Sequence, residues 1–245
     1  FFLICSLETQ LIIQMKQIIY SIVTATIFGF YSSPLIAQNG LHFDGSNDYV
    51  QMTTGGPSGT SNRTVEAWIK TSNSITTQQI LVDWGTMSPN GSRFTFNIIN
   101  NGKLRIEVGG NGFNSSSSVA DGQWHHVAVT YDHSAATKFK LYIDGSLDVS
   151  SNTTVAVNTS ASGPIILGRR NDMVNYYQGI MDEVRIWNTV RTAAEISSDM
   201  NNEFCGASAG LVAYYKFNQG SAGGSNSGLT TLNESVAGSN NGTLN

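Results

Sequence analysis

Charged side chains are scarce in this sequence. Of its 245 residues, only 12% are Asp, Glu, Lys or Arg, about half of the usual share. The formal net charge is −4, so the chain lacks the basic excess that attracts nucleic acid. Glycine, serine, asparagine and threonine fill the gap and give a polar, weakly charged surface of the kind common in extracellular all-β modules. The length suffices for one sandwich domain with its own core.

Long apolar runs are absent after residue 37, so we expect no membrane span in the mature chain. The one apolar run, Ile18–Phe30, follows Met15 and Lys16 and precedes the small residue Ala37. A charged start, an apolar stretch and a small residue at a cleavage point are the signature of a secretory signal peptide. We therefore expect residues 15–37 to be a signal peptide and the protein to be secreted or held at the cell surface.

The start of the sequence leaves two further points open. Residue 1 is not Met, and we expect residues 1–14 to be upstream sequence or the result of a misplaced start. The alternative to a signal peptide is a membrane anchor. Ile18–Phe30 is short for a span of about 20 residues, and it contains Ser21 and Thr24.

Apolar and polar side chains alternate from Leu41 onward, which is the period-two pattern of half-buried β-strands. The alternation is clear in residues 93–99 and 103–108, which Asn101-Gly102 separates. Asn-Gly favours a type I′ turn, so these two segments are expected to form a β-hairpin. Further strands are expected at residues 64–70, 124–131, 138–143, 147–150, 164–167 and 179–187.

One helix is expected, at residues 192–200. Thr192 can cap it, and Glu195 three residues later completes a capping box. Many short strands separated by turns, with a single short helix, predict an all-β sandwich or barrel rather than an α/β fold.

Five strings, in order along the chain, make the prediction more specific. They are LHFDGSNDYVQM (Leu41–Met52), RTVEAWIK (Arg63–Lys70), DGQWHHVAVTYD (Asp121–Asp132), FKLYIDG (Phe139–Gly145) and YQGIMDEVRIWN (Tyr177–Asn188). Together they resemble the laminin-G-like jelly-roll family of the concanavalin A-like lectin/glucanase superfamily, whose members occur in secreted, bacterial-type multidomain surface proteins. The resemblance implies a two-sheet antiparallel jelly-roll sandwich with one short helix near the C-terminal end of the domain. It also implies one calcium ion at the rim in many members.

The resemblance extends from about Leu41 to Met200, so we expect the jelly-roll domain to occupy residues 38–208. The segment Gly210–Gly220 resembles the lead-in to a further repeat in multidomain surface proteins of this family. Residues 209–245 are therefore expected to be a linker and the lead-in to a truncated further repeat.

Catalytic patterns are missing from the sequence. Glycoside hydrolysis usually needs two carboxyl groups that face each other across the sugar. The related glucanases carry an E-x-D-x-E strand, which does not occur here, and the adjacent pair Asp182-Glu183 would point to opposite faces of a strand. His125 and His126 lie inside a strand and are expected to be structural. We expect no catalytic residues and no enzyme activity.

Calcium is the more plausible site chemistry, because this ion prefers six to eight oxygen ligands. The candidate ligands are Asp44, the carbonyls around Gly45, Asp48 and Asp182, and the resemblance supports Asp44 and Asp182 most. The alternative is that Asp44-Gly45 is only a turn and that Asp182 is a solvated edge residue. We hypothesise a structural calcium ion as the one cofactor.

Tryptophans are the other candidates for a site. Trp68, Trp124 and Trp187 lie on expected strands and are expected in the core, whereas Trp84 is followed by Gly85 and a polar loop. Trp84 is therefore the candidate for stacking on a sugar.

The function expected from these observations is extracellular binding or adhesion, with a carbohydrate or another cell-surface component, such as a protein, as partner. The alternative is a carbohydrate-binding accessory domain of a secreted glycan-degrading enzyme whose catalytic domain is absent from this chain. Nucleic acid is not an expected partner.

Overall fold

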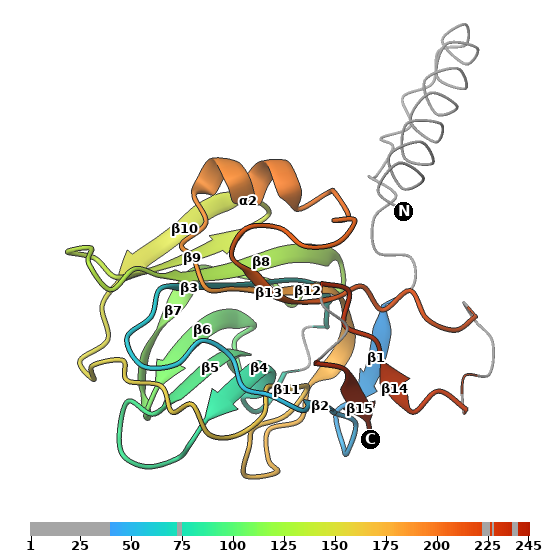
Figure 1. Cartoon of the computed structure of the whole chain (residues 1–245). Helices are drawn as coiled ribbons and strands as arrows, with labels where there is room; N and C mark the ends of the chain where they lie inside the picture. Colours follow the sequence, from blue (N-terminus) through green and yellow to red (C-terminus); the bar gives the residue numbers. More distant parts are fainter. Residues whose placement is uncertain (1–39, 73–74, 222–225, 227, 237–239) are drawn as a thin grey trace, which may run out of the picture. The chain divides into compact units, whose positions relative to one another are not determined.

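The alternating segments form two antiparallel β-sheets that pack face to face in the computed structural model (Figure 1). The structure describes residues 40–245 except 73–74, 222–225, 227 and 237–239. Every residue described below belongs to the same compact unit of the chain.

The upstream segment (1–14) and the signal peptide (15–37) expected from the sequence lie outside the described residues. Within the described part of the chain, no helix is long and apolar enough to cross a membrane.

The first sheet, sheet A, has the order β1-β12-β3-β8-β9-β10, and β13 is a further partner of β12. Its strands are β1 (Leu41–Asp44), β3 (Arg63–Lys70), β8 (Trp124–Tyr131), β9 (Phe139–Ile143), β10 (Ser146–Ser151), β12 (Gln178–Trp187) and β13 (Leu211–Tyr215). Strand β12 pairs with β3 on one side. Its other side is shared: β1 pairs with its first residues and β13 with its last.

The second sheet, sheet B, has the order β14-β15-β2-β11-β4-β5-β6-β7. Its strands are β2 (Val50–Met52), β4 (Gln79–Gly85), β5 (Arg93–Ile98), β6 (Lys103–Val108), β7 (Asn111–Ser118), β11 (Ile166–Leu167), β14 (Thr231–Leu232) and β15 (Gly242–Leu244). Strands β4 and β7 were not predicted from the sequence. Strand β4 is buried along its whole length and so lacks alternation, whereas β7 is rich in serine.

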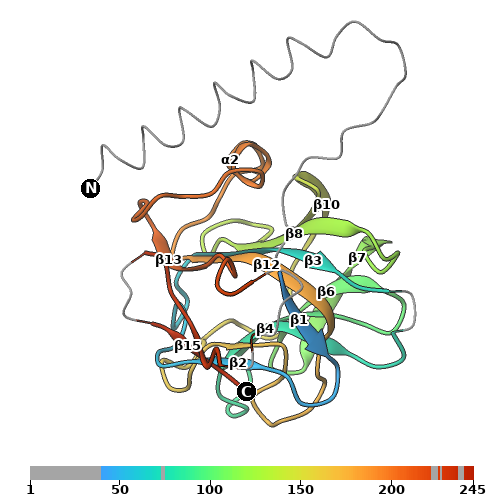
Figure 2. The same ribbon diagram turned by 90° about the vertical axis from the view of Figure 1, so that its right-hand side faces the viewer.

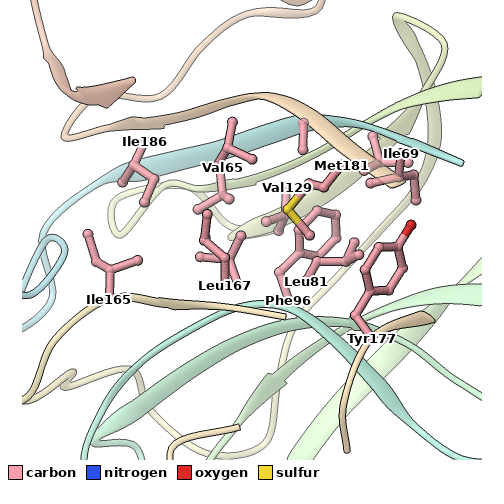
Figure 3. Packing of buried hydrophobic residues seen from close by; sticks show 14 of the residues in the cluster. Val65, Ile69, Leu81, Phe96, Val129, Ile165, Leu167, Tyr177, Met181 and Ile186 are labelled. Carbon is pink, nitrogen blue, oxygen red and sulfur yellow. The ribbon is translucent and has the colours of Figure 1, made fainter. Parts of the chain in front are cut away.

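The core fills the space between the two sheets. Figure 3 shows Val65 and Ile186 of sheet A and Leu81 and Phe96 of sheet B pointing into this space, and all four are fully buried. Burial of such a side chain stabilises the fold by about 1.5–3 kcal/mol. The predicted all-β, two-sheet antiparallel jelly-roll sandwich is confirmed.

In two hairpins, glycine provides the positive φ that the turn requires. The expected hairpin between β5 and β6 is present, but its turn is not type I′, because Gly102 has a positive φ of 74° and Asn101 does not. A loop of three residues with glycine in the left-handed position is the next commonest solution. Asp144 and Gly145, between β9 and β10, have φ values of 50° and 75°, as a type I′ turn requires.

The expected helix is present as α2 (Ala193–Asp199), and its capping box is confirmed. The Thr192 hydroxyl accepts from the Glu195 amide at 3.2 Å, and the Glu195 carboxylate accepts from the Thr192 amide at 2.7 Å. Ile196 is the buried residue of α2 and packs with Ala128 and Tyr142 on the outer face of sheet A.

The C-terminal segment completes both sheets, which corrects the expected domain boundary at residue 208. Strand β13 pairs with β12, and β15 pairs with β2. Tyr49 and Asn245 exchange two backbone hydrogen bonds, of 3.0 and 3.2 Å. The physical reason is that β12 and β2 would otherwise expose unpaired backbone edges. Residues 211–215 and 242–244 are therefore parts of this sandwich rather than the lead-in to another repeat.

Candidate functional site: a cavity at the edge of the sandwich

The turn after β1 contains three of the four expected calcium ligands. Asp44 Oδ1 accepts hydrogen bonds from the amides of Ser46 at 2.7 Å and Asn47 at 3.3 Å, and Asp48 Oδ2 accepts from the Asp44 amide at 2.8 Å. The bond from Ser46 lowers the pKa of Asp44. Gly45 has a φ of 83°, so the turn requires glycine there. One oxygen of each carboxylate thus holds the turn.

Asp182, the fourth expected ligand, lies elsewhere. Asp44 is opposite Gln178 in the register of β1 and β12, so Asp182 is four residues further along, about 13 Å away. Asp182 is only 3% exposed, and burial, followed by the nearby Glu183, raises its pKa to about 7.

The structure therefore brings Asp44, Gly45 and Asp48 together and leaves Asp182 apart, so the four residues do not fit one calcium ion. Among the described residues, no group of three or more His, Cys, Asp or Glu side chains could hold a metal. The turn interpretation of Asp44-Gly45 has direct support from its hydrogen bonds. Asp182 is not the solvated edge residue of the alternative interpretation either, since it is buried.

Trp84 is fully buried, which corrects its expected role as a surface for sugar stacking. Its indole nitrogen donates to the Pro57 carbonyl at 3.1 Å, and its ring lies 4.7 Å from that of Phe94. The residue follows a run of buried side chains in β4, so it points into the core rather than toward the following loop.

The other motif residues hold α2 and the segment after it onto sheet A. Trp187 donates to Glu66 at 2.8 Å, and Trp68 donates to the Met200 carbonyl at 2.7 Å. Arg185 donates to the Glu183 carboxylate at 2.7 Å, to the carbonyl of Asp199 at the end of α2, and to the carbonyl of Asn202 after it. These groups are buried, and together they explain why ionisable residues and tryptophans occur in the motifs.

The two adjacent histidines have structural positions. His126 is buried near Glu66, and burial lowers its pKa to about 3. His125 lies between two carboxylates, with Nδ1 2.8 Å from Asp144 and Nε2 3.2 Å from Asp121. The hydrogen bond with Asp144 raises the pKa of His125. Since both ring nitrogens of His125 are engaged, neither is available as a general base.

A cavity of about 450 Å³ opens at the edge of the sandwich beside β1. Figure 2 looks toward this edge, where β1, β2, β15 and the C-terminus lie. The described lining comes from β1, from the turn before β2, from the segment that crosses from sheet A to sheet B, and from β14 and the end of β15. Its residues are Gly40, Leu41, His42, Phe43, Asp48, Tyr49, Phe217, Asn218, Gln219, Gly220, Ser221, Asn226, Leu229, Thr231, Leu232, Leu244 and Asn245.

Apolar and polar groups both line this cavity. Leu229 and Phe217 provide apolar surface, while Asp48, His42 and Tyr49 provide hydrogen-bonding groups. Within the described part of the chain, the His42 ring and the Tyr49 hydroxyl form no hydrogen bond. A pocket of 300–1,000 Å³ with mainly apolar walls and a few polar groups is the usual form of a small-molecule site.

Phe217 is a strained residue in the wall of the cavity. Its φ is 50°, in the left-handed region that bulky side chains rarely adopt. Such conformations cost about 1–3 kcal/mol and cluster at functional sites. The neighbouring Asn218 donates to Glu203 at 2.9 Å, and Gln219 donates to the Thr231 carbonyl at 3.2 Å, so the crossing segment is held at both ends.

A family model, described as the concanavalin A-like lectin/glucanases superfamily, matches residues 44–197. This chain belongs to that superfamily. The match covers the turn with Asp44 and Asp48 but not the crossing segment with Phe217. The resemblance drawn from the five strings is thereby confirmed.

Three solved structures show the same superfamily fold. A candidate carbohydrate binding protein from Bacteroides ovatus ATCC 8483 has a TM-score of 0.61 at 22% identity, covering 84% of this chain and 59% of its own. The native heptameric SAP-like pentraxin from Limulus polyphemus has a TM-score of 0.51 at 17% identity, covering 64% and 78%. The CBM40 of Ruminococcus gnavus IT-sialidase bound to α2,3 sialyllactose has a TM-score of 0.51 at 18% identity, covering 66% and 96%. This chain therefore spans 59% of the length of the Bacteroides protein.

Most cavity residues were not predicted from the sequence. Asp48 was chosen as a calcium ligand, and the segment 217–232 was assigned to a further repeat. One signal could have placed that segment: Leu211, Ala213 and Tyr215 alternate as buried residues of a strand do. Recognition of that strand would have kept the crossing segment in this domain.

Proposed function

We propose that this chain is a secreted, non-catalytic carbohydrate-binding module and that the cavity beside β1 holds the sugar. The observation that carries the proposal is the cavity itself, whose volume is about 450 Å³. A sugar ring presents apolar C–H faces and hydroxyl groups that both donate and accept. Phe217 and Leu229 could pack against the C–H faces of the ring. The polar lining residues Asp48, His42 and Tyr49 could form hydrogen bonds with its hydroxyl groups.

The comparisons support a carbohydrate ligand in general terms. The Bacteroides protein is described as a candidate carbohydrate binding protein, and the Ruminococcus domain as bound to sialyllactose. A shared fold does not fix the ligand, because function depends on the site rather than on the scaffold. The proposal for this chain therefore rests on its own cavity.

The side chains that line the cavity support binding without catalysis, because they offer too few carboxyl groups for hydrolysis. Asp48 is the single carboxylate among the described lining side chains. Hydrolysis of a glycosidic bond by the usual route needs two carboxyl groups about 5–9.5 Å apart. In the described structure no hydrogen bond joins the His42 ring to a carboxylate or hydroxyl that would orient it as a base.

Calcium and secretion stay predictions. A calcium ion would use the Asp44–Asp48 turn alone, through the carboxylate oxygens that do not hold the turn. Because Asp48 also lines the cavity, calcium at this turn would couple metal binding to sugar binding. Export is expected from the signal peptide at residues 15–37.

The test is a binding screen of the full chain against immobilised plant, microbial and animal glycans, with millimolar calcium and again with a chelator. His42→Ala removes a cavity side chain that forms no hydrogen bond, so it should leave the fold intact and weaken binding at least several-fold. His133→Ala is the matched control, since His133 lies between β8 and β9 and does not line the cavity. Equal binding by both variants would place the sugar elsewhere, and no binding by any glycan would reject the proposed function.

A further inference from the structure

The described side chains that line the cavity include one carboxylate and neither lysine nor arginine. Asp48 is the carboxylate, and lysine and arginine do not occur among the lining residues. The remaining polar groups are neutral amides and hydroxyls together with the His42 ring. The ligand therefore meets a negative charge that no cation in the described lining offsets.

The surroundings of the cavity do not reverse this sign. Glu203 accepts from Asn218 at 2.9 Å, directly behind a lining residue, and Lys216 offsets that carboxylate at 3.2 Å. Arg169 stacks on the ring of Tyr49 at 3.8 Å, but it is only 4% exposed and does not line the cavity. An anionic ligand would thus approach Asp48 without a lysine or arginine in the described lining to pair with.

We infer that the cavity selects neutral saccharides over saccharides that carry a carboxylate, an inference that rests on the proposed function. A carboxylate on the ligand about 4 Å from Asp48 would be repelled strongly enough to weaken binding by about tenfold or more. Desolvation of a second anion in a partly enclosed site adds to this cost. Neutral sugars instead gain a charge-assisted hydrogen bond from a hydroxyl to Asp48.

The experiment compares neutral and acidic saccharides of matched backbone: lactose with 3′-sialyllactose, and galacto-oligosaccharides with oligogalacturonides. Dissociation constants are measured by calorimetry on the full chain at pH 8 with a chelator, so that no calcium ion offsets the charge of Asp48. In whichever matched pair shows binding, the neutral saccharide is expected to have a dissociation constant at least about tenfold lower than that of the acidic one. The preference should shrink as salt rises from 0.05 to about 0.5 M, because salt screens the repulsion.

Asp48→Asn is the decisive variant. Asparagine keeps an acceptor for the Asp44 amide, so the turn should be retained while the charge is lost. The preference for neutral saccharides should then fall to about twofold or less. Asp132→Asn is the control, since Asp132 is half-buried in the turn between β8 and β9 and does not line the cavity.

Two results would overturn the inference. Equal or tighter binding of the acidic saccharide would show that another group, such as Arg169, recognises the carboxylate. A preference that persists in Asp48→Asn would show that Asp48 does not create it. Failure of all four saccharides and of every glycan in the wider screen would instead reject the proposed function.

Discussion

Removal of the charge of Asp182 should stabilise this protein at alkaline pH. In the folded state burial raises the pKa of Asp182 to about 7, against 3.8 for an exposed aspartate. Between these values the folded protein keeps the proton while the unfolded chain loses it. Stability therefore falls as pH rises from about 4 to about 7, and the loss is complete above pH 7.

The magnitude follows from the two pKa values. From pH 5 to pH 7 the loss grows by about 1.4 kcal/mol per pH unit, or about 3 kcal/mol in total. Asp182→Asn abolishes this loss and keeps the oxygen that accepts from the Glu183 amide at 2.9 Å. Asparagine must also place its NH₂ group in a buried site, but that cost is the same at both pH values. The change between pH 5 and pH 8 is therefore the informative quantity.

The assay is thermal unfolding of the wild type and of Asp182→Asn at pH 5 and pH 8, followed by tryptophan fluorescence. The Tm of the variant minus the Tm of the wild type should be about 6–12 °C larger at pH 8 than at pH 5. Asp132→Asn is the control: hydrogen bonds from Ser134 lower the pKa of Asp132, so its effect should not change above pH 5. A gain that is equal at both pH values would refute the reasoning. A variant that loses stability in calcium, but not in chelator, would instead restore Asp182 as a metal ligand.

Two further predictions test other parts of the fold. The pKa of His125 is raised by its hydrogen bond to Asp144, so the stability that this contact provides is full below about pH 6.5 and is lost as pH rises through the folded pKa. His125→Gln should therefore cost about 0.5–1 kcal/mol at pH 6 and less at pH 9, measured by urea unfolding; an equal cost at both would contradict a charged contact. Amide hydrogen exchange should be slow in β13 and β15, because both strands pair within the sheets. Exchange as fast as that of an unfolded peptide would instead support a domain that ends at residue 208.

The alternating segments could be predicted because their apolar side chains recur at every second residue, as the buried face of a strand requires. Expected residues 103–108 and 124–131 match β6 and β8 to the residue, and the capping box located α2. Strand β4 was missed because both of its faces are covered, so that Asp83 is buried along with Val82. Burial on both faces removes the alternation on which the prediction depends.

The candidate site was less predictable because it depends on pairing between distant segments. Asp48 was selected for its carboxylate, but its neighbours in the cavity include Leu229 and Leu244, which are 181 and 196 residues away in sequence. Strands β1 and β12, which carry Asp44 and Asp182, do pair. The register nevertheless sets Asp44 opposite Gln178 and not opposite Asp182. Strand neighbours can be inferred from fold class, whereas register cannot.

The residues that identify the superfamily and the residues that would choose a ligand are largely different. Glu66, Trp68, Arg185 and Trp187 come from the identifying strings, and they hold α2 and the segment after it onto sheet A. The cavity takes one wall from the first string and the other from the crossing segment around Phe217, which lies beyond the matched residues. Changes in that crossing segment could therefore alter the ligand without disturbing the contacts under α2. For this reason superfamily membership predicts the sandwich well and the saccharide poorly, and the sugar preference of this chain has to be read from Asp48 and its neighbours in the cavity.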